Sequence, residues 1–252
     1  MITFSLQSGS NGNAIYVEAG DVRLLFDAGI SGKRAEGRMR VHGRDIRDVD
    51  ALLISHDHVD HIRSAGIFQR KFALPIYMTR PTHAATYCDL GSLSDVRYFK
   101  RGAQLNFNGV TVHTVPTPHD AADGVAFIVE HEHKRLGIFT DLGHPFRDLV
   151  SQLDTLDACY IESNYDPVML ETGPYPYHVQ QRIRGQAGHL SNEESAELVR
   201  AAGTRLRWAA IAHLSEQNNE PQLALDTHRR RIGKHLPLHL ASRYEVSAVM
   251  EV

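Results

Sequence analysis

The chain has 252 residues, of which 42% are hydrophobic and 23% charged, and this balance excludes a disordered or collagen-like chain. Two cysteines, Cys88 and Cys159, are too few for a disulfide scaffold or a thiolate metal site. The net charge of −3 excludes the global basic excess of a protein that coats nucleic acid. The unusual feature of the composition is its 16 histidines.

The chain carries no sign of a membrane segment or of a domain boundary. No apolar run approaches the roughly 18 residues that cross a bilayer, and residues 1–15 lack the basic and apolar regions of a signal peptide. We therefore expect a soluble, cytoplasmic protein with no membrane partner. No repeat or Pro/Gly/Ser-rich linker divides the chain, so we expect one domain over residues 1–252. These patterns determine neither a protein partner nor the oligomeric state.

Short apolar runs, many of them rich in β-branched residues, predict strands. In chain order these runs cover residues 14–19, 22–26, 51–54, 110–115, 125–129, 136–139, 158–161 and 208–212. Turn signals at Asn11-Gly12 and Gly20-Asp21 predict hairpins among the first strands.

Helical patterns separate several of these strands. They predict helices over 62–72, ended by Pro75, and over 81–90. A third helix starts at Ser191, where Ser191 and Glu194 form a capping box, and stops at Gly203. The mixture of strands and helices predicts an α/β domain. The basic run 228–231, followed by Lys234 and His235, is equally compatible with a solvated helix face and with phosphate contacts.

Four predicted strands are followed within a few residues by an imidazole or a carboxylate. Run 51–54 leads to His56, run 110–115 to His119, run 136–139 to Asp141 and run 208–212 to His213. A sheet whose strands end together would bring these side chains to one edge, which is where open α/β sheets place their sites.

The densest group is His56, His58, Asp60 and His61, an H-x-H-x-D-H pattern. In an extended segment His56 and His58 point to the same side, and a helical turn near Asp60 moves Asp60 and His61 toward a second point. Imidazole and carboxylate ligands suit Zn²⁺, with Mn²⁺ and Fe²⁺ as competitors. Packing alone does not explain three histidines and an aspartate in six positions, so we expect two metal half-sites.

The 56–61 motif resembles the signature of the metallo-β-lactamase superfamily, whose fold is an αββα four-layer sandwich with two metals at its edge. Seven further stretches resemble the WalJ (YycJ) family of that superfamily. These stretches are residues 8–14, 26–29, 140–143, 162–166, 173–176, 188–192 and 212–219, and together they cover nearly the whole chain.

The resemblance implies two divalent metal ions and a role for each motif residue. His56, His58 and His119 would bind the first ion, Asp60, His61 and His213 the second, and Asp141 would bridge them. Asp141 in place of Cys, and His61 in place of Arg, argue against a true β-lactamase. His189 lies in a Gly-His-Leu-Ser stretch similar to a segment of ribonuclease Z, which implies a catalytic contact with the scissile phosphate. Alternatively, His189 has no catalytic role and only stands at the start of the following helix, before the Ser191 cap.

Two divalent ions with Asp60 and Asp141 form a net positive centre that attracts a phosphodiester. A hydroxide shared by the ions can attack phosphorus, oriented by Asp60, and His189 can donate a proton to the leaving oxygen.

Residues 165–184 supply a candidate substrate wall. Tyr175 can stack on a base while Arg182 and Arg184 hold phosphates, as in single-stranded nucleic acid sites. The alternative is that this segment is only a stiff surface loop and does not contact substrate. Ser10 and Asn13 either line the pocket or only form the Asn-Gly turn.

The spacing of the motif residues predicts a minimal core. His119 and Asp141 are 22 positions apart, too close for the exosite arm of long ribonuclease Z chains, and Asp141 and His213 are 72 positions apart, too close for a β-CASP insertion. We expect a dinuclear phosphodiesterase that acts on a DNA end as a 5′-to-3′ exonuclease. The alternatives are a small-molecule hydrolase of a cyclic phosphodiester, thioester or lactone, and a metal-stabilised binding protein without catalysis.

Overall fold

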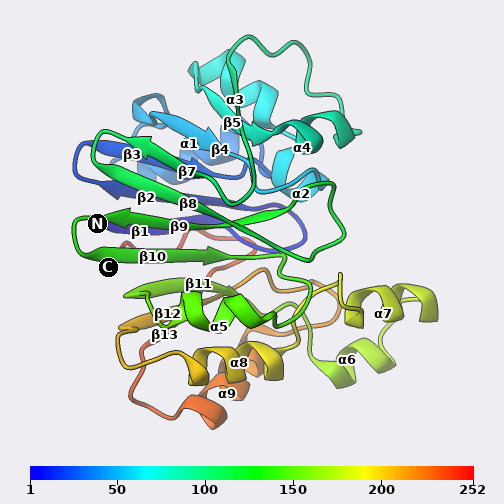
Figure 1. Ribbon diagram of the computed structural model, residues 1–252. Coiled ribbons are helices and arrows are strands. Elements are labelled where there is room, and N and C mark those ends of the chain that lie inside the picture. Colours follow the sequence, from blue (N-terminus) through cyan, green and yellow to red (C-terminus); the bar gives the residue numbers. More distant parts are fainter.

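The computed structural model describes the backbone of residues 1–252 and every side chain except that of Arg147. Two seven-stranded sheets face each other, and helices cover the outer face of each sheet (Figure 1). These four layers form the αββα sandwich expected from the sequence.

The first sheet has the strand order β14-β1-β2-β3-β4-β5-β6. Its strands are β1 (Ile2–Gln7), β2 (Ala14–Ala19), β3 (Val22–Phe26), β4 (Ala51–Leu53), β5 (Ile76–Thr79), β6 (Val96–Phe99) and β14 (Met250–Glu251). Strands β1 to β3 are antiparallel, and β3 to β6 are parallel.

The second sheet has the order β13-β12-β11-β10-β9-β8-β7. Its strands are β7 (Gln104–Phe107), β8 (Val110–Pro116), β9 (Val125–His131), β10 (Lys134–Phe139), β11 (Ala158–Glu162), β12 (Trp208–Ala212) and β13 (Leu238–Leu240). Strands β7 to β10 are antiparallel, and β10 to β13 are parallel. Strands β8, β10, β11 and β12 therefore all point in one direction.

Helices fill the outer layers. They are α1 (Gly32–Val41), α2 (Val59–Ile62), α3 (Ala65–Phe72), α4 (Arg80–Ala85), α5 (Arg147–Leu153), α6 (Pro167–Thr172), α7 (Tyr177–Arg184), α8 (Asn192–Ala201) and α9 (Pro221–Ile232), with a 3₁₀ turn at Ile46–Asp48. Helices α2, α4 and α7 lie at the end of the sandwich opposite both chain termini (Figure 1). Within the described part of the chain, no helix is long and apolar enough to span a membrane.

The alternation of side chains along the strands builds the layers. Ile15 and Val17 face the second sheet, while Tyr16 between them packs toward the helices. Phe26 of the first sheet meets Phe127 of the second, with ring centres 5.0 Å apart. Both sheets thus contribute to one central core.

The eight strands predicted from the sequence are confirmed, as β2, β3, β4 and β8 to β12. The helix predicted after Ser191 is confirmed as α8, with the reciprocal capping box of Ser191 and Glu194 in place. Strands β1, β5, β6, β7, β13 and β14 were not predicted.

Two helix predictions were wrong in extent. The helix expected over 62–72 is two helices, α2 and α3, because Arg63 and Ser64 donate hydrogen bonds to the carbonyls of Gly29 and Ala28 after β3. The helix expected over 81–90 ends at Ala85. Beyond it the chain follows tertiary contacts, such as the hydrogen bond from Arg70 to the carbonyl of Leu90.

The basic run 228–231 forms the end of α9. Its arginines are exposed and pair with acidic side chains of α8 and α9, for example Arg231 with Glu193 and Glu197. His228 is fully buried. The structure therefore favours a solvated helix face over a phosphate contact.

Candidate metal centre

The first cluster of ligand-type side chains comprises His56, His58 and His119. They follow β4, begin α2 and follow β8 respectively, and one ring nitrogen of each lies within 4.8 Å of the others. His119 donates from Nδ1 to the carbonyl of Gly188 at 2.8 Å, and His58 donates from Nε2 to the carbonyl of Asp120 at 3.2 Å. These bonds leave His119 Nε2 and His58 Nδ1 facing each other, 3.2 Å apart.

The second cluster comprises Asp60, His61 and His213. Asp60 Oδ2 lies 3.5 Å from His61 Nε2 and 3.4 Å from His213 Nε2. On the opposite side of its ring, His61 Nδ1 contacts the carboxylate of Asp27 at 2.7 Å. A carboxylate in this position orients a metal-binding histidine and raises its basicity.

Asp141 lies between the two clusters. Its Oδ2 is 3.1 Å from His61 Nε2, and its Oδ1 is 3.6 Å from His119 Nε2. Because the carboxylate presents one oxygen to each cluster, it occupies the position that a bridging ligand requires.

The donor atoms fit divalent metal ions. His56 Nε2 and Asp141 Oδ2 are buried, and neither makes a hydrogen bond to any described residue. Ligand atoms bound at 2.0–2.1 Å around a tetrahedral Zn²⁺ would lie about 3.3 Å apart, which is close to the spacings of 3.1–3.6 Å found here. Buried polar atoms without partners are rare, and a bound metal ion would supply a partner for both of them.

Burial and charge act differently on the two clusters. Burial lowers the pKa of His56 well below its usual value, with the nearby His61 adding to the effect, and burial also lowers the pKa of His119. Burial opposes protonation of His61 and His213 as well, but Asp141 and neighbouring carboxylates outweigh it and raise both pKa values, that of His213 to about 10. The lowered pKa values of His56 and His119 favour the neutral imidazole, the form that binds metal, whereas carboxylates concentrate negative charge at the second cluster.

Three residues at the centre have left-handed backbone conformations. Asp27, Asp141 and His213 have φ values of 65°, 55° and 55°, and each directly follows the end of a strand or lies two residues beyond it. Such conformations are uncommon outside glycine and cost about 1–3 kcal/mol each. Their concentration here is typical of a functional site.

Two carboxylates of the centre were not assigned a role from the sequence. Glu162 is fully buried and contacts His189 Nδ1 at 2.7 Å and His213 Nδ1 at 3.2 Å, and Asp27 supports His61. The signal was present, because Glu162 ends β11 and Asp27 follows β3, the same position relative to a strand that identified Asp141.

The predicted site residues come from both sheets rather than from the edge of one sheet. His56, His58, Asp60 and His61 follow β4 of the first sheet, whereas His119, Asp141 and His213 follow strands of the second. All seven predicted ligands are within the clusters.

A cavity of about 320 Å³ opens onto both clusters. Of the predicted substrate contacts, Ser10, Tyr175 and Arg182 line it, as does His189. Asn13 is instead buried beside His61, with its amide nitrogen 2.9 Å from Nε2. Arg184 points elsewhere and donates to the carbonyl of Pro167.

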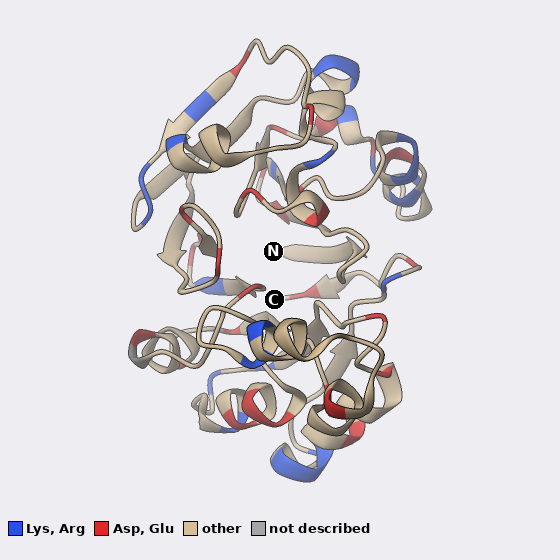
Figure 2. Cartoon of the chain, turned by 90° about the vertical axis from the view of Figure 1, so that its right-hand side faces the viewer, with Lys and Arg blue, Asp and Glu red and all other residues tan. Residues whose placement is uncertain are grey.

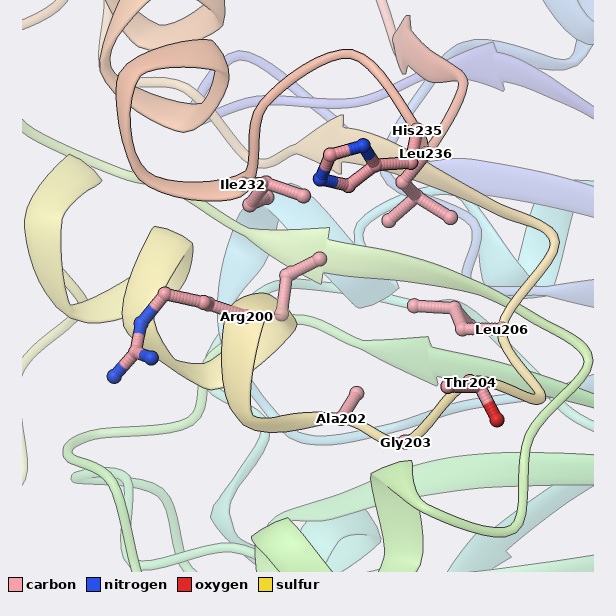
Figure 3. Close-up of a pocket in the computed structure, with 9 residues that line it drawn as sticks. Arg200, Ala202, Gly203, Thr204, Leu206, Ile232, His235 and Leu236 are labelled. Carbon is pink, nitrogen blue, oxygen red and sulfur yellow. The ribbon is translucent and has the colours of Figure 1, made fainter.

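A different cavity of about 380 Å³ lies between the ends of α8 and α9 (Figure 3). Ile232, Leu206 and Leu236 make much of its lining apolar, and Arg200 points away from them. None of the metal-ligand clusters among the described residues includes a residue of this cavity. The candidate metal ligands of the described residues therefore lie at the strand ends and not at this cavity.

Comparison with known proteins agrees with this geometry. Residues 8–168 match the model of the metallo-beta-lactamase superfamily. The chain belongs to the metallo-β-lactamase superfamily. The resemblance identified from the motifs is confirmed, and the protein is a hydrolase of the metallo-β-lactamase fold.

Two bacterial relatives of this metallo-β-lactamase-fold protein match most of the chain. One is named exodeoxyribonuclease WalJ, from Streptococcus pneumoniae serotype 2 (strain D39), with 33% identity over 224 residues, covering 87% of this chain and 83% of the relative. Another, exodeoxyribonuclease YycJ from Bacillus anthracis, is 33% identical over 222 residues, covering 87% and 84%. The crystal structure of YhfI from Bacillus subtilis superimposes with a TM-score of 0.75, at 16% identity over 99% of both chains, and shows the fold.

Proposed function

We propose that this protein is a dinuclear metal-dependent phosphodiesterase that degrades DNA from the 5′ end. The observation that carries the proposal is the pair of ligand clusters with Asp141 between them, in contact with His61 of one and His119 of the other. The names of the WalJ and YycJ relatives support DNA as the substrate.

In this proposal one ion would be held by His56, His58 and His119 and the other by Asp60, His61 and His213, with Asp141 as the ligand available to both. Two divalent ions, Zn²⁺, Mn²⁺ or Fe²⁺, would polarise the phosphodiester and lower the pKa of water. Asp60 borders the cavity and can accept a hydrogen bond from a water molecule that approaches the phosphate.

His189 is the proposed proton donor to the leaving oxygen. Its Nδ1 is engaged by Glu162 at 2.7 Å, which leaves Nε2 for the substrate in the cavity that the ring lines. Glu162 accepts a hydrogen bond from the backbone N–H of Leu142 at Oε2 and contacts His189 and His213 through Oε1, so we assign it a positioning role. Together with Asp141, His189 and His213 it also forms a further group of ligand-type side chains.

Substrate contacts are proposed for Ser10, Tyr175 and Arg182. Arg182 pairs with Asp120 through Nε at 2.6 Å, and the remaining guanidinium nitrogens can donate to a phosphate. We further propose that residues 1–252 form one domain in the cytoplasm, without an exosite arm.

The test is turnover by metal-depleted protein to which Mn²⁺ or Zn²⁺ is returned. Substrates are DNA labelled at the 5′ or the 3′ end and bis-(p-nitrophenyl) phosphate. His58→Ala removes a ligand, and His133→Ala, an exposed histidine of the β9–β10 turn, is the matched control.

We expect the 5′ label to be released in the first cleavage and the 3′-labelled strand to shorten stepwise. Both should be abolished in His58→Ala and retained in His133→Ala. Hydrolysis of the small diester alone would replace the proposal with a small-molecule phosphodiesterase. Absence of turnover on every substrate would contradict it.

A further inference from the structure

We propose that a surface formed by α4 and β6 binds a single-stranded polynucleotide next to the metal centre. We define this α4–β6 surface by Arg80, His83, Tyr98, Lys100 and Arg101. The inference rests on the proposed function, because it names where the strand lies when its end occupies the centre.

The α4–β6 surface is hollowed and rich in planar groups. A cavity of about 600 Å³ is lined by Arg80, Tyr98, Lys100 and Arg101. The Arg80 guanidinium lies 4.2 Å from the centre of the Tyr98 ring, and His83 Nδ1 lies 2.7 Å from the Tyr98 hydroxyl. The Tyr98 ring, 39% exposed, is therefore held in place before any ligand binds.

The positive charge of this surface is partly uncompensated. Among the described residues Arg80 and Lys100 make no ion pair, whereas Arg101 lies 3.3 Å from Asp123. The basic run of α9 behaves differently, since each of its arginines has an acidic partner. Cations without acidic partners beside an aromatic ring are the combination that binds a phosphate backbone with stacked bases.

Two chain segments run from this surface to the metal centre. Two residues after α4, Tyr87 is 78% exposed and lines the cavity of the centre together with His58. The loop after β8 supplies His119 to the centre and Asp123 to the α4–β6 cavity. Figure 2 views this end of the molecule and shows Lys and Arg segments along its upper left margin, as well as at its upper right and lower margins.

Acidic residues along this path do not oppose a phosphate strongly. Asp123 is paired with Arg101, and Asp120 is paired with Arg182. A strand that leaves the centre along this loop therefore meets neutralised carboxylates and then the cations Arg80 and Lys100. A single nucleotide bound at the metal centre would not reach this surface. The ligand that contacts both is therefore a polymer.

The test uses metal-loaded protein and phosphorothioate oligo-dT, which resists hydrolysis, with 5 or 20 nucleotides and a fluorescent label. Binding is measured by fluorescence anisotropy between 0.05 and about 0.5 M salt. This range defines the salt slope, which is the slope of the logarithm of the binding constant against the logarithm of the salt concentration. The variant is Arg80→Gln with Lys100→Gln, two exposed side chains, and the matched control is Arg229→Gln with Arg230→Gln on α9.

We expect the α4–β6 variant to lower the salt slope for the 20-mer by about 1.4, because each contact with a single strand contributes about 0.7. Relative to 1 M salt, where these contacts contribute nothing, the same slope makes binding about 25-fold weaker at 0.1 M salt. The 5-mer should be affected less, and turnover of bis-(p-nitrophenyl) phosphate should not change.

Equal losses in the α9 control, an unchanged 20-mer affinity, or no binding of the 20-mer by the unchanged protein would each overturn the inference. Failure of the proposed function looks different. If DNA is not hydrolysed but the variant still loses 20-mer binding, the surface is a polynucleotide site and the catalytic proposal alone is wrong.

Discussion

Each candidate ligand histidine is oriented by what contacts the other side of its ring. Backbone carbonyls contact His58 and His119, and carboxylates contact His61 and His213. The Ser55 hydroxyl contacts His56 Nδ1 at 2.9 Å. Ring orientation at the centre therefore depends on residues that are not ligands, of which Asp27 is an example.

Asp27→Asn tests this dependence at the residue scale. The change keeps the shape of the side chain but removes the negative charge 2.7 Å from His61 Nδ1. We expect metal affinity to fall by about tenfold to a hundredfold, measured by competition with a metal-binding dye. Asp21→Asn, in an exposed turn, should leave affinity unchanged. Equal affinity in both variants would mean that Asp27 does not support the centre.

Among the elements, the loop after β3 positions α2. Ala28 donates its backbone hydrogen bond to the carbonyl of His61 at 2.7 Å, and Gly29 lies against the carbonyl of Asp60. The ligands Asp60 and His61 are thus held through backbone contacts that leave no room for a side chain.

Gly29→Ala tests this contact, because the added Cβ would lie 1.7 Å from the oxygen of Asp60. We expect a loss of about 3 kcal/mol, at the upper end of overpacking costs, in urea unfolding, together with weaker metal binding. Gly37→Ala in α1 meets nothing within 4 Å and should stabilise the protein by about 1 kcal/mol. A stable Gly29→Ala protein with normal metal binding would contradict the contact.

The packing of α9 on α8 includes a buried histidine. His228 hydrogen-bonds Ser195 and the carbonyl of Ala224, and burial lowers its pKa to about 4. Because the unfolded chain binds this proton near pH 6.5, the stabilisation is complete above pH 6.5 and is lost as the pH falls toward 4.

This linkage predicts a loss of about 2 kcal/mol between pH 7.5 and pH 5 in the free energy of unfolding. In His228→Gln that component should disappear, whereas His133→Gln should behave like the unchanged protein. Identical pH profiles for all three proteins in urea unfolding would refute the assignment to His228.

Considered as a whole, the molecule has a central core to which both sheets contribute. Trp208 of β12, the single tryptophan, donates to the carbonyl of Glu251 in β14 and so connects the two sheets. Neither sheet keeps its inner face buried without the other.

Unfolding should therefore be one transition for residues 1–252. We expect tryptophan fluorescence, which reports on Trp208, to change at the same urea concentration as far-ultraviolet circular dichroism. Two separated transitions would mean that the sheets unfold independently, and would contradict a single domain.

The sequence by itself determined the features that depend on neighbouring residues. The H-x-H-x-D-H motif, the runs that form β2, β3 and β4, and the Ser191 capping box all act over a few positions, so spacing alone identified them. The positions of Asp141 and His213 followed from the same local pattern of a strand and a polar residue after it.

Only the tertiary structure decided the features that depend on distant segments. The break between α2 and α3 arises from hydrogen bonds to the loop after β3, and the support of His213 by Glu162 joins the ends of β11 and β12. Arg184 faces Pro167 rather than the cavity, although Arg182 lines it two positions earlier. Residues this close in sequence differ in role because folding, and not spacing, determines which groups meet across the two sheets.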